Sequence, residues 1–589
     1  MIPCRCALEL LRQSIKLVTP RSRPRRIKHF ENSQVQPKAY VLATMLSLLA
    51  TLMGCSDRSA ERADSEFDNY NGTTPKATAV ATRGEQDSDI AANTVRQQIG
   101  TETTKSGLPN ILFILTDDQR RDTIRALGNN EIVTPNLDQL VARGVSFSQA
   151  SIMGAMNGSV GTPSRAMVMT GRSVFELEPS GRTIAEQYIT LPQALKEQGY
   201  YTFHTGKWSN GKQAFARSFS HAENIFFGAK SDHYNIPLHD FDPQGRYADS
   251  VAPKTSRVHS TVLYSSTAQK FLRTYDRPEP FFLSLSFQAP HDPRQIAKSE
   301  RFGYAASELS LGESFRGEHG FDNGELDVQD EWTAGVPRDK REVQNHLALY
   351  YEMITQIDRE LGKILQALND TGRLTNTLIV FTSDNGLALG RHGLMGKQSL
   401  YEHSVGVPLI FAGPTLPKAK KLNEPVFLSS IYPTIIELLG LNKIASVTSS
   451  SFYPSLISSP THQDTVPLQA TPRIHAYKNF QRALVSWPYK LMAYNVEQKP
   501  RYQLFNLIED PEEVTDLLQQ SSTPQLEDLK DALILQMQEL LVAQGDAVDF
   551  NEPQWKLPRI DSWVDYMRAT NPEELGTLRR VAEQERLRF

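Results

Sequence analysis

Residues 161–172 read GTPSRAMVMTGR, and the interpretation of the whole chain starts from this stretch. Thr162 and Pro163 suit the first turn of a helix, and Gly171 is placed to end the helix in a left-handed conformation. A helix that begins here presents unpaired backbone N–H groups and the side chain of Arg165 at its N-terminus. Because such an end carries partial positive charge, the sequence predicts an anion-binding helix.

Continuous apolar runs of strand length lie on both sides of this helix, as expected for buried parallel strands. Four of them lead into polar or charged groups: Asn110–Thr116 before Asp117 and Asp118, Tyr200–Thr205 before Lys207, Phe281–Phe287 before His291, and Leu378–Ser383 before Asp384 and Asn385. Predicted helices at 134–142, 191–198 and 346–368 alternate with the strands, and Pro408–Ala412 is a fifth strand. The pattern indicates an α/β fold with a parallel-rich sheet, whose ligands bind beyond the carboxyl ends of the strands.

Two of these strand ends carry oxygen ligands for a hard cation. Asp117, Asp118, Asp384 and Asn385 come without a thiolate or a nearby histidine pair, so they suit Ca²⁺, with Mg²⁺ as the alternative, rather than zinc. Paired carboxylates and Asp-Asn-Gly are each common in solvated turns. The metal site is therefore predicted from the position of both groups at the ends of buried strands, beside an anion-binding helix.

The run Gly161–Arg165 and the following helix resemble the signature of type I sulfatases, which belong to the alkaline phosphatase superfamily. That signature reads Cys/Ser-x-Pro-Ser-Arg, and its first residue is oxidised to formylglycine, the nucleophile. Similar runs extend the resemblance over roughly Leu108–Leu518; they include Thr205–Trp208, Ala289–Pro293, Leu389–Lys397 and Tyr401–Gly413.

The resemblance implies a large sheet sandwiched by helices, and a smaller C-terminal domain that contains an antiparallel sheet. It implies one calcium ion that touches a sulfate oxygen. It also implies that Lys207, His291 and Lys397 contact the sulfate beside Arg165, because cationic donors bind oxyanions strongly.

Two positions depart from the family pattern. Gly161 stands where the formylglycine precursor belongs, and Ser209 stands where the family usually has the histidine that assists expulsion of sulfate. The three cysteines, Cys4, Cys6 and Cys55, all lie before the predicted folded domain, so no formylglycine is expected. Because the family mechanism needs an attacking group and then a base, the sequence predicts a site that has lost both.

Three interpretations follow from these departures. The first is a pseudoenzyme that binds sulfate esters, such as sulfated polysaccharide fragments, without efficient turnover. The second is a hydrolase of sulfate or phosphate monoesters in which Thr162, Ser159 or a calcium-bound water attacks. The third is ordinary sulfatase activity despite both changes. Because fold does not settle function, all three stay open at this point, with the first favoured.

The beginning of the chain looks like an export signal. A basic segment precedes an apolar run, Tyr40–Met53, that is short for a membrane-spanning helix and suits a signal-peptide core. The run ends at Cys55 in a sequence that resembles a bacterial lipobox, so we expect lipidation of Cys55 and a membrane-anchored lipoprotein facing the periplasm or cell exterior. A plain signal peptide or membrane anchor is the alternative, and translation is expected to start later than Met1.

Composition completes the sequence-based description. With 63 basic and 67 acidic residues, the chain has no positive excess that favours nucleic acid as a partner.

Arg482–Tyr494 and Tyr502–Leu507 look like strands joined by turns, which predicts the small antiparallel sheet. We divide the chain into a basic extension with a signal peptide (1–54), a flexible tether (55–107), the α/β domain (108–460), the small domain (461–545) and a charged extension (546–589).

Overall fold

Two adjacent parallel strands, β1 (Asn110–Thr116) and β9 (Thr377–Ser383), lie in the middle of an eight-stranded sheet. The strand order is β11-β2-β10-β9-β1-β8-β4-β5. Strands β9, β1, β8, β4 and β5 run parallel, whereas β10 is antiparallel to both β9 and β2. The other strands of this sheet are β2 (Val145–Ser151), β4 (Tyr201–Lys207), β5 (His221–Phe226), β8 (Phe281–Ser286), β10 (Leu409–Ala412) and β11 (Lys420–Phe427).

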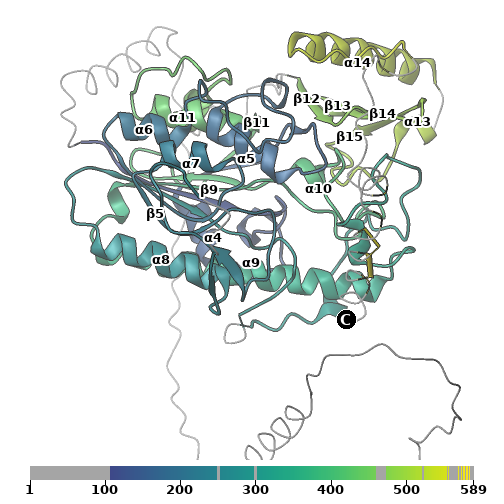
Figure 1. Ribbon diagram of the computed structural model, residues 1–589. Helices are drawn as coiled ribbons and strands as arrows, with labels where there is room; N and C mark the ends of the chain where they lie inside the picture. Colours follow the sequence, from purple (N-terminus) through teal and green to yellow (C-terminus); the bar gives the residue numbers. More distant parts are fainter. Residues whose placement is uncertain are drawn as a thin grey trace, which may run out of the picture. The chain divides into compact units, whose positions relative to one another are not determined.

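Helices cover both faces of this sheet (Figure 1). Alternate side chains of β1 point to opposite faces of the sheet, so Phe113 belongs to one apolar core and Leu112 to the other. One face carries α5 (Gly161–Thr170), α6 (Leu191–Glu197), α7 (Lys212–Ser218) and α11 (Ile431–Leu438). The opposite face carries α4 (Pro135–Arg143), α8 (Ser260–Thr274) and α9 (Lys340–Asp370). The predicted parallel-rich α/β architecture is confirmed.

The long helix α9 starts earlier than the sequence pattern indicates. Asp339 caps it, because its carboxylate accepts hydrogen bonds from the backbone N–H groups of Arg341 and Glu342, both at 2.9 Å. The prediction of a start near His346 was therefore wrong by about two turns. The apolar stripe used for that prediction does not reach the capped end, where charged residues form the first turn.

A second sheet lies beyond residue 472 and confirms the predicted antiparallel C-terminal unit. Its order is β15-β14-β13-β12-β3, and β12 to β15 are antiparallel neighbours. The fifth strand, β3, comes from the α/β part of the chain and pairs in parallel with β12, so the second sheet contains a strand from that part which no sequence pattern indicated. The elements are β3 (Gly154–Ala155), β12 (Arg473–Tyr477), β13 (Gln481–Ser486), β14 (Tyr489–Val496), β15 (Lys499–Asn506), α13 (Leu517–Gln520) and α14 (Pro524–Ala543).

The remaining elements are short. They are α10 (Glu402–Val405), α12 (Tyr453–Ile457) and a hairpin of β6 (Ile236–Leu238) and β7 (Lys254–Ser256). The computed structural model describes residues 107–247, 253–297, 301–458, 472–520 and 523–552, with isolated residues beyond these up to 583. The expected signal peptide, lipidated Cys55, tether and most of the charged extension lie outside the described residues. Within these described ranges, no helix is both long and apolar enough to cross a membrane.

We expect Asp358 to make the stability of the fold depend on pH. Its buried carboxylate on α9 accepts from the backbone N–H of Leu137 at 2.7 Å, and burial raises its pKa from 3.8 to about 6. A raised folded-state pKa means that the contribution to stability is complete below pH 4 and is lost as the pH rises through 6. In urea unfolding, the stability of the wild type relative to Asp358→Asn should therefore fall by about 3 kcal/mol between pH 4 and pH 7.

Asp370→Asn, at the exposed end of the same helix, is the matched control and should show no such change. The expectation would be contradicted if the difference in free energy of unfolding between the wild type and Asp358→Asn stayed constant or grew from pH 4 to pH 7.

Candidate functional site

Four oxygen-bearing side chains meet where β1 and β9 end. They are Asp117 and Asp118 after β1, and Asp384 and Asn385 after β9. The backbone N–H of Asp384 donates to Thr116 O at 3.2 Å, and that of Asp118 donates to Asp384 Oδ1 at 3.1 Å. Asn385 Nδ2 donates to Asp118 Oδ1 at 2.8 Å. The structure thus gathers the residues that the sequence predicts as metal ligands into one cluster, and all four are buried.

Three cationic side chains from three other segments contact these carboxylates. Arg165 lies in the first turns of α5, Lys207 is the last residue of β4, and Lys397 lies in the loop after β9. All three are buried. The contacts are Arg165 Nε to Asp384 Oδ2 at 2.7 Å, Lys397 Nζ to Asp118 Oδ1 and Oδ2 at 2.6 and 2.8 Å, and a close ion pair between Lys207 Nζ and Asp117 Oδ2.

His291, which follows β8, completes the ring of predicted site residues. Its Nε2 lies 3.7 Å from Asp118 Oδ2, and its Nδ1 lies 2.9 Å from Asp292 Oδ1. Burial opposes the charged form of the ring, but the carboxylates of Asp118 and Asp292 outweigh it and raise the pKa of His291. Asp117, Asp118 and His291 offer ligand atoms that all lie within 4.8 Å of one another, so a metal ion could also be held on this side.

The carboxylates are crowded despite their cationic partners. Burial, together with the charge of Asp384, raises the pKa of Asp117 from 3.8 to about 6. The pKa of Asp384 moves the other way, to about 2, because Arg165 and Lys207 outweigh the cost of its burial. The three acidic groups are therefore so close together and so little solvated that Asp117 binds its proton unusually tightly.

Gly161 lies directly against this cluster. A Cβ atom placed on Gly161 would lie 2.7 Å from Asp384 Oδ2 and 3.1 Å from Asn385 Oδ1. Asn385 Oδ1 is buried and has no hydrogen-bond partner among the described residues. Any side chain at position 161 would thus point at the oxygen ligands, and the glycine leaves an acceptor oxygen there without a donor.

The other residues named from the sequence have different surroundings. Ser209 Oγ donates to Gly228 O at 3.3 Å, and no hydrogen bond or ion pair in the described ranges joins it to the carboxylates. Ser159 Oγ donates to Thr162 Oγ1 at 3.2 Å, so these two hydroxyl groups contact each other beside Gly161. The structure therefore brings the predicted metal ligands and cations together, whereas the three hydroxyl groups bond to other partners.

Supporting residues that sequence reasoning missed come from distant segments. Glu331, in the polar segment before α9, accepts hydrogen bonds from the backbone N–H groups of Met395 at 2.9 Å and Gly396 at 2.8 Å. It also pairs with the buried Arg338. Glu331 therefore holds the loop that presents Lys397. The only sequence signal is the polar and acidic composition of this segment, which indicates no particular contact.

Asn210 holds a second segment of the site in place, the start of α5. Its Nδ2 donates to Thr162 O at 2.9 Å and to Gly181 O at 2.7 Å, which ties the start of α5 to two neighbouring loops. Ser286, the last residue of β8, accepts a hydrogen bond from Arg165 Nη1 at 2.5 Å. Neither residue stands in a recognisable pattern, because each acts on a segment that is remote in sequence.

Comparison with known protein families agrees with this geometry. The family described as Sulfatase matches residues 109–441, more than half of the chain. The family described as N-sulphoglucosamine sulphohydrolase, C-terminal, matches residues 390–542, which include strands β12 to β15 of the second sheet. The chain therefore belongs to the sulfatase family, which generally uses a divalent metal ion.

Individual relatives are moderately similar. A sulfatase of Formosa agariphila is 28% identical over 407 residues, which cover 63% of this chain and 76% of the relative. An N-acetylglucosamine-6-O-sulfatase of Bacteroides thetaiotaomicron is 24% identical over 427 residues, covering 62% and 74%. A protein solved in complex with its substrate D-glucosamine-2-N,6-O-disulfate superimposes with a TM-score of 0.58 at 21% identity, covering 76% of this chain and 100% of that one. At this identity the likeness shows the fold.

We expect Glu331→Gln to loosen the loop that presents Lys397. Glutamine offers one acceptor oxygen for two backbone N–H groups and turns its amide N–H₂ towards Arg338, so at least one hydrogen bond is lost. Amide hydrogen exchange at Met395 and Gly396 should accelerate about tenfold or more. Amides inside β9 and the exposed control variant Glu308→Gln should keep wild-type exchange. Unchanged exchange at both amides would contradict the role given to Glu331.

Proposed function

We propose that this protein binds sulfate esters at a site centred on a divalent cation, and that its capacity to hydrolyse them is impaired. The observation that carries the proposal is the buried cluster of three carboxylates and three fixed cations around Gly161. The cluster supports binding, because it offers ligands for a cation and donors for an oxyanion. The glycine supports impaired turnover, because position 161 has no side chain to attack the ester.

The residues present fit a hard divalent cation. Carboxylate and amide oxygens are the ligands that Ca²⁺ and Mg²⁺ prefer, and Asn385 Oδ1 is a buried acceptor without a donor. The raised pKa of Asp117 is a further sign that the acidic groups lack sufficient positive charge. We propose Asp117, Asp118, Asp384 and Asn385 as the ligands, and Ca²⁺ as the ion with Mg²⁺ as the alternative. The ion would supply positive charge to an oxygen of the bound ester.

Charge balance couples the cation to the anion. Three carboxylates and the cations Arg165, Lys207 and Lys397 sum to zero, so a divalent cation alone would bury two uncompensated positive charges. A sulfate ester alone would leave one uncompensated negative charge. Together the two ligands leave a smaller net charge than the divalent cation alone. When the cation takes over the carboxylates, the two lysines and Arg165 become available as donors to the ester's oxyanion, with His291 beside them.

The ligand that we propose is a sulfated saccharide. Two of the similar proteins, the N-acetylglucosamine-6-O-sulfatase and the protein solved with D-glucosamine-2-N,6-O-disulfate, have names that give a sulfated amino sugar as the substrate. The expected lipidation at Cys55, which lies outside the described residues, would place such a receptor on the outer side of a membrane, where polysaccharide fragments are met. We propose this location and anchoring together with the ligand.

A second candidate function is hydrolysis of sulfate or phosphate esters by a different nucleophile. The contact between Ser159 Oγ and Thr162 Oγ1 at 3.2 Å favours it, because two hydroxyl groups lie beside the place where the family nucleophile stands. Thr162 is also buried and lies in the first turn of α5, whose N-terminus favours anions. Water in the cation site could act instead of either hydroxyl.

We expect binding of a sulfated saccharide to require calcium. In titration calorimetry with glucosamine-6-sulfate, removal of Ca²⁺ by a chelator should weaken binding at least about tenfold, because the cation frees the lysines and Arg165 from the carboxylates and attracts the sulfate group. Asp384→Asn should weaken calcium binding, and Lys397→Ala should weaken sulfate-ester binding while calcium still binds. The exposed Lys443→Ala serves as the matched control and should bind both ligands as the wild type does.

Binding of the sulfated sugar with equal affinity with and without calcium would contradict this expectation. Turnover of sulfate or phosphate esters that disappears in Thr162→Ala would overturn the first function and support the second.

We expect sulfatase activity to appear when the two lost side chains are restored. Gly161→Cys with Ser209→His, produced together with a formylglycine-generating enzyme, should raise hydrolysis of 4-nitrophenyl sulfate or a sulfated sugar by about two orders of magnitude or more over the wild type. Asp384 Oδ2 has to move by a few tenths of an ångström to admit the new Cβ atom, which a side-chain carboxylate can do. The same double variant produced without the maturation enzyme is the control and should stay inactive. A folded, aldehyde-bearing double variant without activity would contradict the proposed anion cage.

A further inference from the structure

Three residues near the end of the chain contact one short segment that precedes α9. Arg568, Leu575 and Arg579 are each helical, and their spacing places them on one face of a helix. Leu575 packs against Trp332, and the guanidinium of Arg579 lies 5.1 Å from the centroid of the same ring. Asp327 accepts a hydrogen bond from Arg568 at 3.1 Å and forms a close ion pair with Arg579. We call Arg568, Leu575 and Arg579 the tail residues.

The apolar contact contributes most to the docking of the tail residues. The side chains of Arg568, Arg579 and Asp327 are 55%, 45% and 49% exposed, and ion pairs as exposed as these contribute little. Leu575 is only 5% exposed. The guanidinium of Arg579 over the indole ring adds a cation–π contact on the same side chain. Trp332 is therefore the residue through which the tail residues hold this segment.

Trp332 is part of a tightly bonded turn. It lies in the middle of the 3-10 helix η6 (Glu331–Thr333). The backbone N–H of Glu331 donates to Val328 O at 3.0 Å, and Trp332 Nε1 donates to Asp327 Oδ1 at 2.8 Å. The segment that the tail residues contact is thus connected to Glu331 by hydrogen bonds within the same turn.

This turn also holds the loop that presents Lys397. The backbone N–H groups of the two residues before Lys397 donate to the carboxylate of Glu331. Asp330 Oδ2 accepts from Gln398 Nε2 at 2.8 Å, and Gln398 Oε1 in turn accepts from the backbone N–H of Lys397 at 2.9 Å. Residues on both sides of Lys397 are therefore bonded to the turn against which the tail residues pack.

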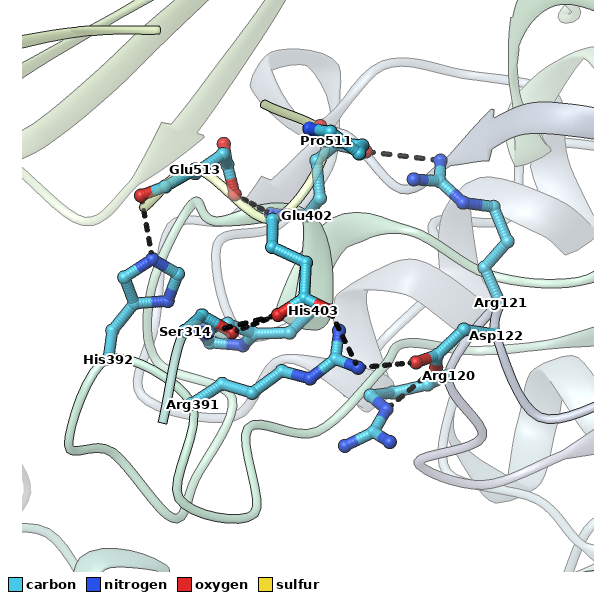
Figure 2. A pocket seen from close by; sticks show the side chains of 11 residues that line it. Arg120, Arg121, Asp122, Ser314, Arg391, His392, Glu402, His403, Pro511 and Glu513 are labelled. Carbon is cyan, nitrogen blue, oxygen red and sulfur yellow. Dashed lines mark hydrogen bonds and ion pairs between the residues drawn. The ribbon is translucent and has the colours of Figure 1, made fainter. Parts of the chain in front are cut away.

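The beginning of the same loop is held by other parts of the chain. Figure 2 shows Arg391 and His392 on the wall of a cavity. Arg391 pairs with Asp122 at 2.6 Å, and His392 Nε2 donates to the backbone oxygen of Glu513 at 2.9 Å. These contacts fix the loop at residues 391 and 392, whereas Asp330 and Glu331 fix it at residues 395–398, next to the amine that faces the carboxylates.

We propose that Leu575 and Arg579 are positioning residues for the sulfate-ester site. Their docking on Trp332 restricts the motion of η6, which keeps Glu331 bonded to the loop and holds Lys397 Nζ where it can donate to an oxyanion. In the described ranges, no hydrogen bond or ion pair joins either residue to the carboxylate cluster, so the cation should bind without them. The proposal rests on the proposed function of this site.

Substitution of Leu575 in the full chain tests the proposal. In Leu575→Ala, amide hydrogen exchange at Met395 and Gly396 should accelerate about fivefold, because η6 loses the contact that restrains it. Titration calorimetry with calcium present should show glucosamine-6-sulfate binding weakened about threefold, since Lys397 is less well ordered before binding. The affinity for Ca²⁺ should stay that of the wild type. Arg579→Ala should act in the same direction by about half as much.

Leu575→Met is the conservative variant. Methionine fills a similar volume against Trp332, so exchange and sugar affinity should both return to wild-type values. Glu583→Gln is the matched control, because Glu583 is exposed and lies one helical turn beyond Arg579. It should resemble the wild type in every measurement. Circular dichroism and unchanged exchange inside β9 establish that each variant is folded.

Wild-type exchange at Met395 and Gly396 in folded Leu575→Ala would overturn the proposal. So would equal losses in Leu575→Ala and Leu575→Met, or a parallel loss of calcium affinity, which would indicate a general effect on folding. Wild-type sugar affinity in Leu575→Ala would refute the positioning role and leave sulfate-ester binding by the wild type intact. If the wild type itself does not bind glucosamine-6-sulfate, the proposed function fails, and exchange at Met395 and Gly396 alone decides whether the tail residues hold the loop.

Discussion

Opposite charges buried at the ends of parallel strands are the constraint on which the rest of this structure depends. Three carboxylates and three cations without access to water would be costly if any of them lacked a partner. They come from four different elements or the loops that follow them, so the partners meet only when β1, β4, β9 and α5 are all in place. The site thus depends on the fold and the fold on the site. The charged side chains that form the ion pairs of the cluster are also the side chains that we expect to bind ligands.

The segments that surround the cluster serve to position it. Glu331 holds the Lys397 loop, Asn210 holds the start of α5, and β3 joins the α/β sheet to the C-terminal sheet. The geometry of the cluster therefore depends on contacts made by residues outside it.

A glycine at position 161 is compatible with membership of the sulfatase family, because the ion pairs of the cluster involve no side chain at that position. The Cβ position of Gly161 points at Asp384 and Asn385, so the glycine places no side chain against these two residues. Function resides in the site rather than in the fold, and a site that keeps its ligands and donors keeps binding as its most direct use. We therefore propose sulfate-ester binding ahead of sulfate-ester hydrolysis.

The sequence by itself determined the α/β architecture, the strands that carry the site and the identity of Gly161, because buried strands and helix signals are local patterns. It also predicted that Asp117, Asp118, Asp384 and Asn385 would meet, since parallel strands bring their carboxyl ends to one edge. Tertiary structure alone decided which cation pairs with which carboxylate, that Glu331 and Asn210 hold the site, and that Arg391, His392 and His403 share a cavity with Glu513. Those contacts join residues between about 50 and 280 positions apart, and no local pattern encodes a distance that only the packed sheets create.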